Sequence, residues 1–109
     1  MIPIRDRAIL VIMRIIARRT LREFWERHRL SKRYLEAWYA DVKTACWITP
    51  QDIKSEYQAA SFLKENRVVF NIKGNTYRLV TRINYDYQIV YIKFVGTHKE
   101  YDQIDANTV

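Results

Sequence analysis

The sequence predicts an α+β fold in which an N-terminal strand and about three helices pack on an antiparallel β-sheet. Helical periodicity occupies the first half of the chain, whereas hairpin patterns fill the second half, and the 109 residues include only two Gly and two Pro. The apolar fraction is 49% and includes three Trp, eight Tyr and four Phe, enough for one core. We therefore expect a single domain over residues 1–109.

The first element expected is a buried strand at residues 10–16, LVIMRII, because its β-branched side chains favour extended backbone, although periodicity alone leaves a helix open here. A helix should follow from Thr20, which begins TLRE, a sequence in which the Thr20 hydroxyl and the Glu23 carboxylate can cap a helix start. The apolar face of this helix would carry Leu21, Phe24, Trp25 and His28.

Two more helices are expected before the sheet. One runs from about Lys32 to Cys46, and its core-facing stripe comprises Leu35, Trp38, Tyr39, Val42, Ala45 and Cys46. The other starts at Thr49 and Pro50, because proline suits the first turn of a helix, and Ile53 and Tyr57 give it an apolar side.

Residues 66–82, NRVVFNIKGNTYRLVTR, predict a β-hairpin whose turn is Gly74 and Asn75, two residues that tolerate positive φ. One face would then carry the opposed pairs Lys73 and Thr76, Asn71 and Arg78, Val69 and Val80, and Arg67 and Arg82. The other face, which should pack on the helices, would hold Val68, Phe70, Ile72, Tyr77, Leu79 and Ile83.

A third strand, IVYIKFV, should follow a turn in NYDYQ. If Tyr85 and Asp86 form that turn, Arg78 lies opposite Lys93, and Val80 lies opposite Tyr91. Val90, Ile92 and Phe94 would then join the core. The polar face would gather Asn71, Lys73, Arg78 and Lys93 at the end where Gly96 leads into THKEYD, which brings His98 and Tyr101 beside them.

The net charge of +7 favours a polyanionic partner, with basic residues distributed along the chain. Cations on one sheet face without acidic neighbours suit RNA. DNA is a less suitable ligand, because the sequence shows no helix-turn-helix spacing. The competing interpretation is an ordinary solvated sheet face, on which Lys and Arg serve solubility. A zinc site is not expected, because Cys46 is the one Cys and the two His are far apart. No cofactor is expected either.

No membrane span is expected, because the apolar run at residues 9–16 is too short and contains Arg14. A signal peptide is not expected either, and the lone cysteine suits a reducing cytoplasm. We interpret that cysteine as a core thiol, and Trp25, Trp38, Trp47 and His28 as core residues.

Such a face could cleave an RNA phosphodiester without metal. The 2′-hydroxyl attacks the phosphorus when a base takes its proton, cations stabilise the charged intermediate, and an acid protonates the leaving oxygen. Arg78 could hold the phosphate, with Lys73 or Lys93 adding charge. His98 and Tyr101 are the candidates for proton transfer, although a surface-loop His that only binds backbone is an open alternative for His98.

The residues 66–102, together with LREFWERH, LEAWYADVK and TPQDIK, resemble the HigB toxins, a branch of the RelE-like mRNA endonucleases of bacterial toxin–antitoxin modules. The resemblance runs from about Met13 to the end of the chain. It implies a compact RelE-like fold, growth-arresting cleavage of mRNA on the ribosome, and a HigA-like antitoxin with a helix-turn-helix. Residues 1–12 would be an N-terminal extension or the product of a misassigned start codon.

The resemblance implies catalytic Arg, Lys, Tyr and His on the concave sheet face and near the end of the chain. We expect Arg78 to stabilise the phosphate and His98 to transfer protons, with Tyr101 and Lys73 assisting. Asp102 either orients His98 or is an ordinary exposed carboxylate. The further residues expected to contact RNA are Arg67, Asn71, Asn75, Arg82, Lys93 and Lys99, the last through the backbone alone.

Two other function classes remain open at this point. One is an RNA or ribosome binder that blocks translation by occupancy without cutting. The other is an interaction module whose basic face docks an acidic protein segment. Cleavage of RNA that requires His98 would distinguish the endonuclease from both of these classes.

Overall fold

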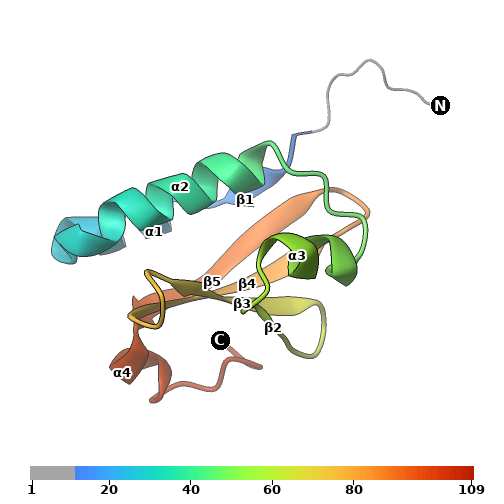
Figure 1. Ribbon diagram of the computed structural model, residues 1–109. Coiled ribbons are helices and arrows are strands. Elements are labelled where there is room, and N and C mark those ends of the chain that lie inside the picture. Colours follow the sequence, from blue (N-terminus) through green and yellow to red (C-terminus); the bar gives the residue numbers. More distant parts are fainter. Residues whose placement is uncertain (1–11) are drawn as a thin grey trace.

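A computed structural model describes residues 12–109, so the first two positions of the expected N-terminal strand and most of the predicted extension lie outside the described residues. The α+β fold is confirmed (Figure 1). The elements are β1 (Arg14–Ile16), α1 (Arg18–Arg27), the 3₁₀ helix η2 (Arg29–Ser31), α2 (Lys32–Lys43), α3 (Pro50–Glu56), β2 (Ser61–Phe62), β3 (Arg67–Ile72), β4 (Tyr77–Asn84), β5 (Ile89–Thr97) and α4 (His98–Tyr101). Within residues 12–109 no helix has the length and apolar character needed to cross a membrane.

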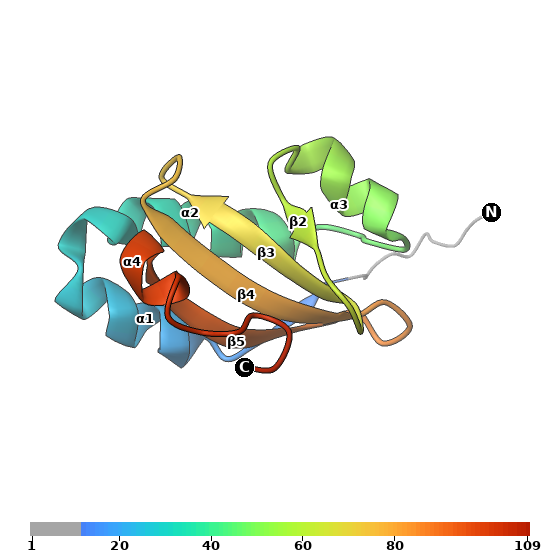
Figure 2. The same ribbon diagram turned by 90° about the horizontal axis from the view of Figure 1, so that it is seen from below.

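The five strands form one sheet in the order β1-β5-β4-β3-β2. β1 runs parallel to β5, and the other neighbours are antiparallel. Helices α1, α2 and α3 lie on one side of the sheet, whereas α4 and the last residues lie on the other (Figure 2). We call these the helix-covered face and the outer face.

The core lies between the sheet and the first three helices, as the hairpin pattern predicts. Trp38 and Trp47 pack on Phe70, with ring centroids 5.4 Å and 6.0 Å away. Both Trp side chains are at most 2% exposed, which confirms their assignment to the core. The predicted inward-facing residues of the hairpin all belong to this cluster: Val68, Phe70, Ile72, Tyr77, Leu79 and Ile83.

The predicted capping box at Thr20 is wrong. Helix α1 starts at Arg18 with Ala17 as its N-cap, so Thr20 lies inside the first turn and its N–H donates to the Ala17 carbonyl at 3.1 Å. Glu23 instead pairs with Arg19 one turn earlier. The end of β1, which is set by its pairing with β5, decides where the chain can turn into the helix.

Helix α2 ends three residues earlier than predicted, and this changes the position of Cys46. The last helical residue is Lys43, and Thr44 is the C-cap. After the helix ends, Ala45 and Trp47 turn inward while Cys46 is exposed, so its interpretation as a core thiol is wrong.

The predicted start of α3 is confirmed. Thr49 is the N-cap and Pro50 is the first helical residue. The Asp52 carboxylate accepts hydrogen bonds from the N–H groups of Ile48 at 2.8 Å and Thr49 at 3.0 Å. These bonds hold the pKa of Asp52 below its usual value of 3.8.

Asp52→Asn should therefore lower the melting temperature near neutral pH. Because the folded pKa lies below the unfolded one, the stabilisation is present above the usual Asp pKa and is lost as the pH falls through the folded value. The difference in melting temperature between wild type and variant should shrink as the solution is acidified below pH 3.8. A difference that stays constant over that range, measured by circular dichroism, would contradict this role.

Candidate functional site

The register of the β3–β4 hairpin matches the prediction. Asn71 pairs with Arg78, Val69 with Val80, and Arg67 with Arg82. The turn differs, because positive φ angles fall on Lys73 (54°) and Gly74 (61°), one residue earlier than predicted. Thr76 donates its N–H to the Lys73 carbonyl at 3.1 Å and closes the turn.

The predicted register between β4 and β5 is wrong. Arg78 lies opposite Gly96 and not Lys93, and Val80 lies opposite Phe94 and not Tyr91. The turn between these strands spans residues 85–88 and is stabilised by the Asn84 Oδ1, which accepts from the Tyr87 N–H at 2.9 Å. A bulge next to Val80 adds a further shift. Lys93 is consequently the unpaired residue of this bulge, opposite the step from Val80 to Thr81 near the middle of β4, and not opposite Arg78.

The middle of the outer face is covered by the end of the chain. Val69 and Val80 are at most 2% exposed and form a second apolar cluster. Phe94 packs in this cluster, so its predicted place in the main core is wrong, although Val90 and Ile92 do join that core. The residues that cover the strands here are Tyr101, Ile104, Ala106 and Val109, with Leu63 beside them.

Arg67 lies under this cover. Its side chain is buried, with the residue 7% exposed, and its Nη1 donates to the Val109 carbonyl at 2.6 Å. The structure therefore places Arg67 as an anchor for the last residues, away from the surface where RNA could reach it. Its cross-strand partner Arg82 is exposed.

Arg78 and Tyr101 meet on the outer face at the end next to the β3–β4 turn, as the sequence predicts. The Arg78 guanidinium carbon lies 5.5 Å from the centroid of the Tyr101 ring. Its Nη1 also donates to the Asn75 carbonyl at 3.1 Å, which orients the group toward the turn. A stacked guanidinium held by a backbone carbonyl is a suitable binding group for a phosphate.

Helix α4 is positioned by its first residues. Thr97 is its N-cap and accepts from the Glu100 N–H at 3.1 Å, while Glu100 accepts from the Thr97 N–H at 2.8 Å. The His98 N–H donates to the Thr76 carbonyl at 3.0 Å, so α4 is attached to the β3–β4 turn. Gly96 leaves room for the Phe94 ring and the Glu100 carboxylate, because a Cβ there would lie 2.5 Å and 2.9 Å from them.

His98 and Asp102 form a pair on α4. The His98 Nδ1 lies 3.2 Å from the Asp102 Oδ2, and the two side chains are 45% and 56% exposed. Because Asp102 occupies Nδ1, the other ring nitrogen, Nε2, is the one available to exchange a proton with a ligand. Tyr101 is three residues after His98 and therefore projects from the same side of this helical turn.

The other predicted residues do not join this cluster. Lys73 turns toward the helix side, where its Nζ lies 6.0 Å from the Tyr34 ring centroid of α2. Asn71 lines a hollow of about 170 Å³ together with Tyr34 and Lys73. Asn75 and Lys99 are exposed on the β3–β4 turn and α4. Tyr34 was missed by the sequence analysis, because its contact with Lys73 depends on how α2 crosses the hairpin.

Arg82 and Lys93 share a separate groove at the far end of β4. This groove has a volume of about 650 Å³ and is also lined by Asn66, Asn84, Asp86 and Tyr91. The sequence predicts Lys93 beside Arg78. In the structure it lies in this groove instead, because the longer turn and the bulge shift the register between β4 and β5. Among residues 12–109, no group of three His, Cys, Asp or Glu side chains is arranged to hold a metal ion.

Residues 31–104 match a family model described as HigB_toxin, RelE-like toxic component of a toxin-antitoxin system. The chain is also 29% identical over 96 residues to the mRNA interferase toxin HigB of Escherichia coli K12, across 86% of this chain and 92% of that protein. The mRNA interferase HigB of Escherichia coli O157:H7 and that of Shigella flexneri match with the same identity and coverage. Arg78, His98 and Tyr101 all lie within the segment matched by the family model.

Proposed function

Because the chain belongs to the HigB family of RelE-like toxins of toxin–antitoxin systems, we propose that it is an endoribonuclease that cleaves mRNA. The observation that supports this proposal is the stack of Arg78 on Tyr101, a residue that shares helix α4 with His98, because a phosphate-binding cation near a group able to transfer protons suits this reaction. The names of the three relatives, which are mRNA interferases, support the choice of substrate.

The reaction that suits these groups starts at the 2′-hydroxyl of the nucleotide before the cut. A base takes the hydroxyl proton, the 2′-oxygen bonds to phosphorus, and Arg78 stabilises the charge on the phosphate oxygens. The bond from phosphorus to the 5′-oxygen then breaks, and an acid protonates that oxygen. The products are a 2′,3′-cyclic phosphate and a 5′-hydroxyl.

His98 is the group that we assign to proton transfer, through Nε2. Asp102 is its positioning residue, because it occupies Nδ1 and limits rotation of the ring. Tyr101 supports Arg78 through its ring, and its hydroxyl is a second candidate for proton transfer. Lys73 lies outside the cluster of Arg78 and Tyr101, with its Nζ 6.0 Å from the Tyr34 ring. We therefore assign it to RNA binding beside the site and not to the reaction itself.

The proposal extends to the partners of the protein. We expect cleavage to take place on the translating ribosome in the cytoplasm, and a HigA-like antitoxin with a helix-turn-helix to neutralise it. Membership of a toxin–antitoxin family supports the existence of an antitoxin.

Induced expression of the chain in bacteria, followed by primer extension on cellular mRNA, tests this function. Growth should stop and new mRNA ends should appear within minutes of induction. The matched control is the Arg78→Ala/His98→Ala double variant at the same protein level, which should produce neither effect. Growth arrest without new ends would show a binder that blocks translation by occupancy, and no arrest with soluble wild-type protein would indicate an interaction module.

A further inference from the structure

The positive charge of the protein is concentrated in one part of the chain. Residues 14–33 contain eight Lys or Arg and two Glu, whereas residues 34–109 contain nine Lys or Arg and nine Asp or Glu. Residues 34–109 therefore carry no net charge in total, although basic residues were expected along the whole chain, and the acidic residues of this part lie outside the strands. The excess belongs to β1, α1, η2 and the start of α2.

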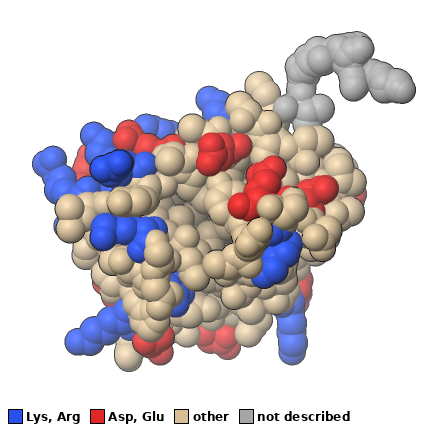
Figure 3. Space-filling view, in the orientation of Figure 1, with Lys and Arg blue, Asp and Glu red and all other residues tan. Residues whose placement is uncertain are grey.

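Four of these cations lie at the junction where α1 ends and α2 begins. This basic corner consists of Arg27, Arg29, Lys32 and Arg33, all exposed. The space-filling view shows Lys and Arg side chains gathered at this end of the molecule, on the left (Figure 3).

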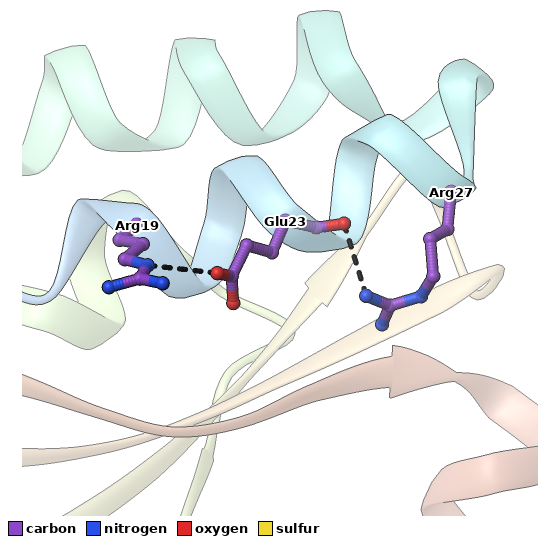
Figure 4. Close-up of polar contacts among 3 residues, drawn as sticks. All are labelled: Arg19, Glu23 and Arg27. Atoms are coloured by element: carbon purple, nitrogen blue, oxygen red, sulfur yellow. Dashed lines mark hydrogen bonds and ion pairs between the residues drawn. The ribbon is translucent and has the colours of Figure 1, made fainter.

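In the part of the chain that the structure describes, no carboxylate forms an ion pair with a cation of the corner, although Glu26 and Glu36 flank it in α1 and α2. Within residues 12–109, the one ion pair between a Lys or Arg and a carboxylate joins Arg19 to Glu23, at 2.9 Å. Glu23 also accepts a hydrogen bond from Arg27 through its backbone carbonyl, at 3.2 Å, so its carboxylate is left to Arg19 (Figure 4). The corner therefore presents a positive surface that favours an anionic ligand.

Tyr34 lies between the basic corner and the β3–β4 turn. Its ring lies 5.5 Å from the Arg33 guanidinium carbon and 6.0 Å from the Lys73 Nζ. The residue is 38% exposed and lines the hollow of about 170 Å³ that Asn71 and Lys73 also line. The hollow lies on the helix-covered side and also contains Asp41, whereas the Arg78 guanidinium lies on the outer face, and the two are separated by β3, in which Asn71 pairs with Arg78.

We propose that the basic corner binds the backbone of the single-stranded RNA that flanks the cleaved phosphodiester, and that Tyr34 stacks on a base where the strand passes from the site to the corner. This inference rests on the proposed function, because it takes the cleaved RNA as its ligand. An aromatic ring beside two cations is the combination that single-strand binding proteins use, with cations for phosphates and a ring for bases. An acidic protein segment would use the cations but would leave the ring and the hollow without a role.

The test is binding of the full-length protein to 2′-O-methyl RNA, which lacks the attacking hydroxyl and is not cut. Fluorescence anisotropy with oligonucleotides of about 4 and about 16 nucleotides, which bracket the site sizes of single-strand binding domains, measures affinity across a salt series. The corner variant is Arg29→Gln/Arg33→Gln. The matched control is Lys43→Gln/Lys64→Gln, which removes the same charge from exposed positions elsewhere.

The corner variant should weaken binding of the long RNA and reduce its salt slope by about 1.4, since each phosphate contact on a single strand contributes about 0.7. Binding of the short RNA should not change, and the control should behave as wild type. Tyr34→Leu should weaken long-RNA binding with an unchanged slope, because stacking is not a charge effect, and Tyr34→Phe should restore it.

Equal losses in the corner and control variants would overturn the inference, because they would show a general effect of net charge. Unchanged RNA binding in the corner variant would also overturn it, and a simultaneous loss of neutralisation by the antitoxin would identify an acidic protein as the ligand. These results are separable from the proposed function. If new mRNA ends appear but the corner variant binds RNA as wild type does, the proposed endonuclease activity is retained and only this inference is refuted. If RNA binding depends on the corner but no new mRNA ends appear, only the proposed endonuclease activity is refuted.

Discussion

Arg78→Ala should lower the rate of mRNA cleavage by about 10²- to 10³-fold, the effect of removing one group that stabilises a charged transition state. Arg78 is the cation that the structure places against Tyr101, and the Asn75 carbonyl fixes its orientation. The alanine removes both the charge and the bidentate geometry that suits a phosphate. The measurement is the rate of appearance of cleaved mRNA ends in a translating extract at saturating toxin.

Arg78→Lys is the matched control for geometry. It retains the charge but loses the planar group that stacks on Tyr101, so its rate should lie between those of wild type and alanine. Melting temperatures of the three proteins should be close, because Arg78 is only half-buried and is outside both apolar clusters. Cleavage by Arg78→Ala within a few-fold of wild type would move the phosphate-binding role to another residue.

His98→Ala should lower the cleavage rate by about 10²- to 10⁴-fold, the usual contribution of a positioned acid or base. The imidazole has its Nδ1 at 3.2 Å from Asp102 and its Nε2 open to a ligand, which is the arrangement that proton transfer needs. RNA binding by the variant should be almost unchanged, because Arg78 and the other cations expected to hold the phosphates are retained. The measurement is the single-turnover rate of mRNA cleavage, with binding measured separately on 2′-O-methyl RNA.

Asp102→Asn separates positioning from chemistry. The amide can still contact Nδ1 through its oxygen, so the rate should fall less than in His98→Ala. Tyr101→Phe keeps the ring beneath Arg78 and removes only the hydroxyl. A large loss in Tyr101→Phe together with a small loss in His98→Ala would exchange the roles that we assign to these two residues.

The residues of the candidate site were predicted to different degrees. Arg78, His98 and Tyr101 were predicted together because they follow from a hairpin and from a short motif close behind it in the chain. Lys93 was placed beside Arg78 and lies in the groove with Arg82, because two extra turn residues and one bulge shift the partner of Arg78 to Gly96. Bulges depend on the packing of both faces of a sheet, which a strand pattern does not contain.

The burial of Arg67 is a second feature that the strand pattern does not predict. Alternation along β3 places it correctly on the outer face, opposite Arg82. Its burial at 7% exposure arises because residues 101–109 fold back over that face and bring the Val109 carbonyl to its guanidinium. A pattern that repeats every two residues specifies a face, but it does not specify whether a distant segment covers that face.

Local signals in the amino-acid sequence were sufficient for the α+β class, the start of α3, the β3–β4 register and the inward face of the hairpin, because each depends on neighbouring residues or on a period of two. The start of α1, the exposure of Cys46, the β4–β5 register, the cover over Arg67 and the link from Tyr34 to Lys73 arise from contacts between segments far apart in the chain. These contacts form only when the sheet and helices pack, so the three-dimensional arrangement decides which cations face a ligand and which stabilise the fold.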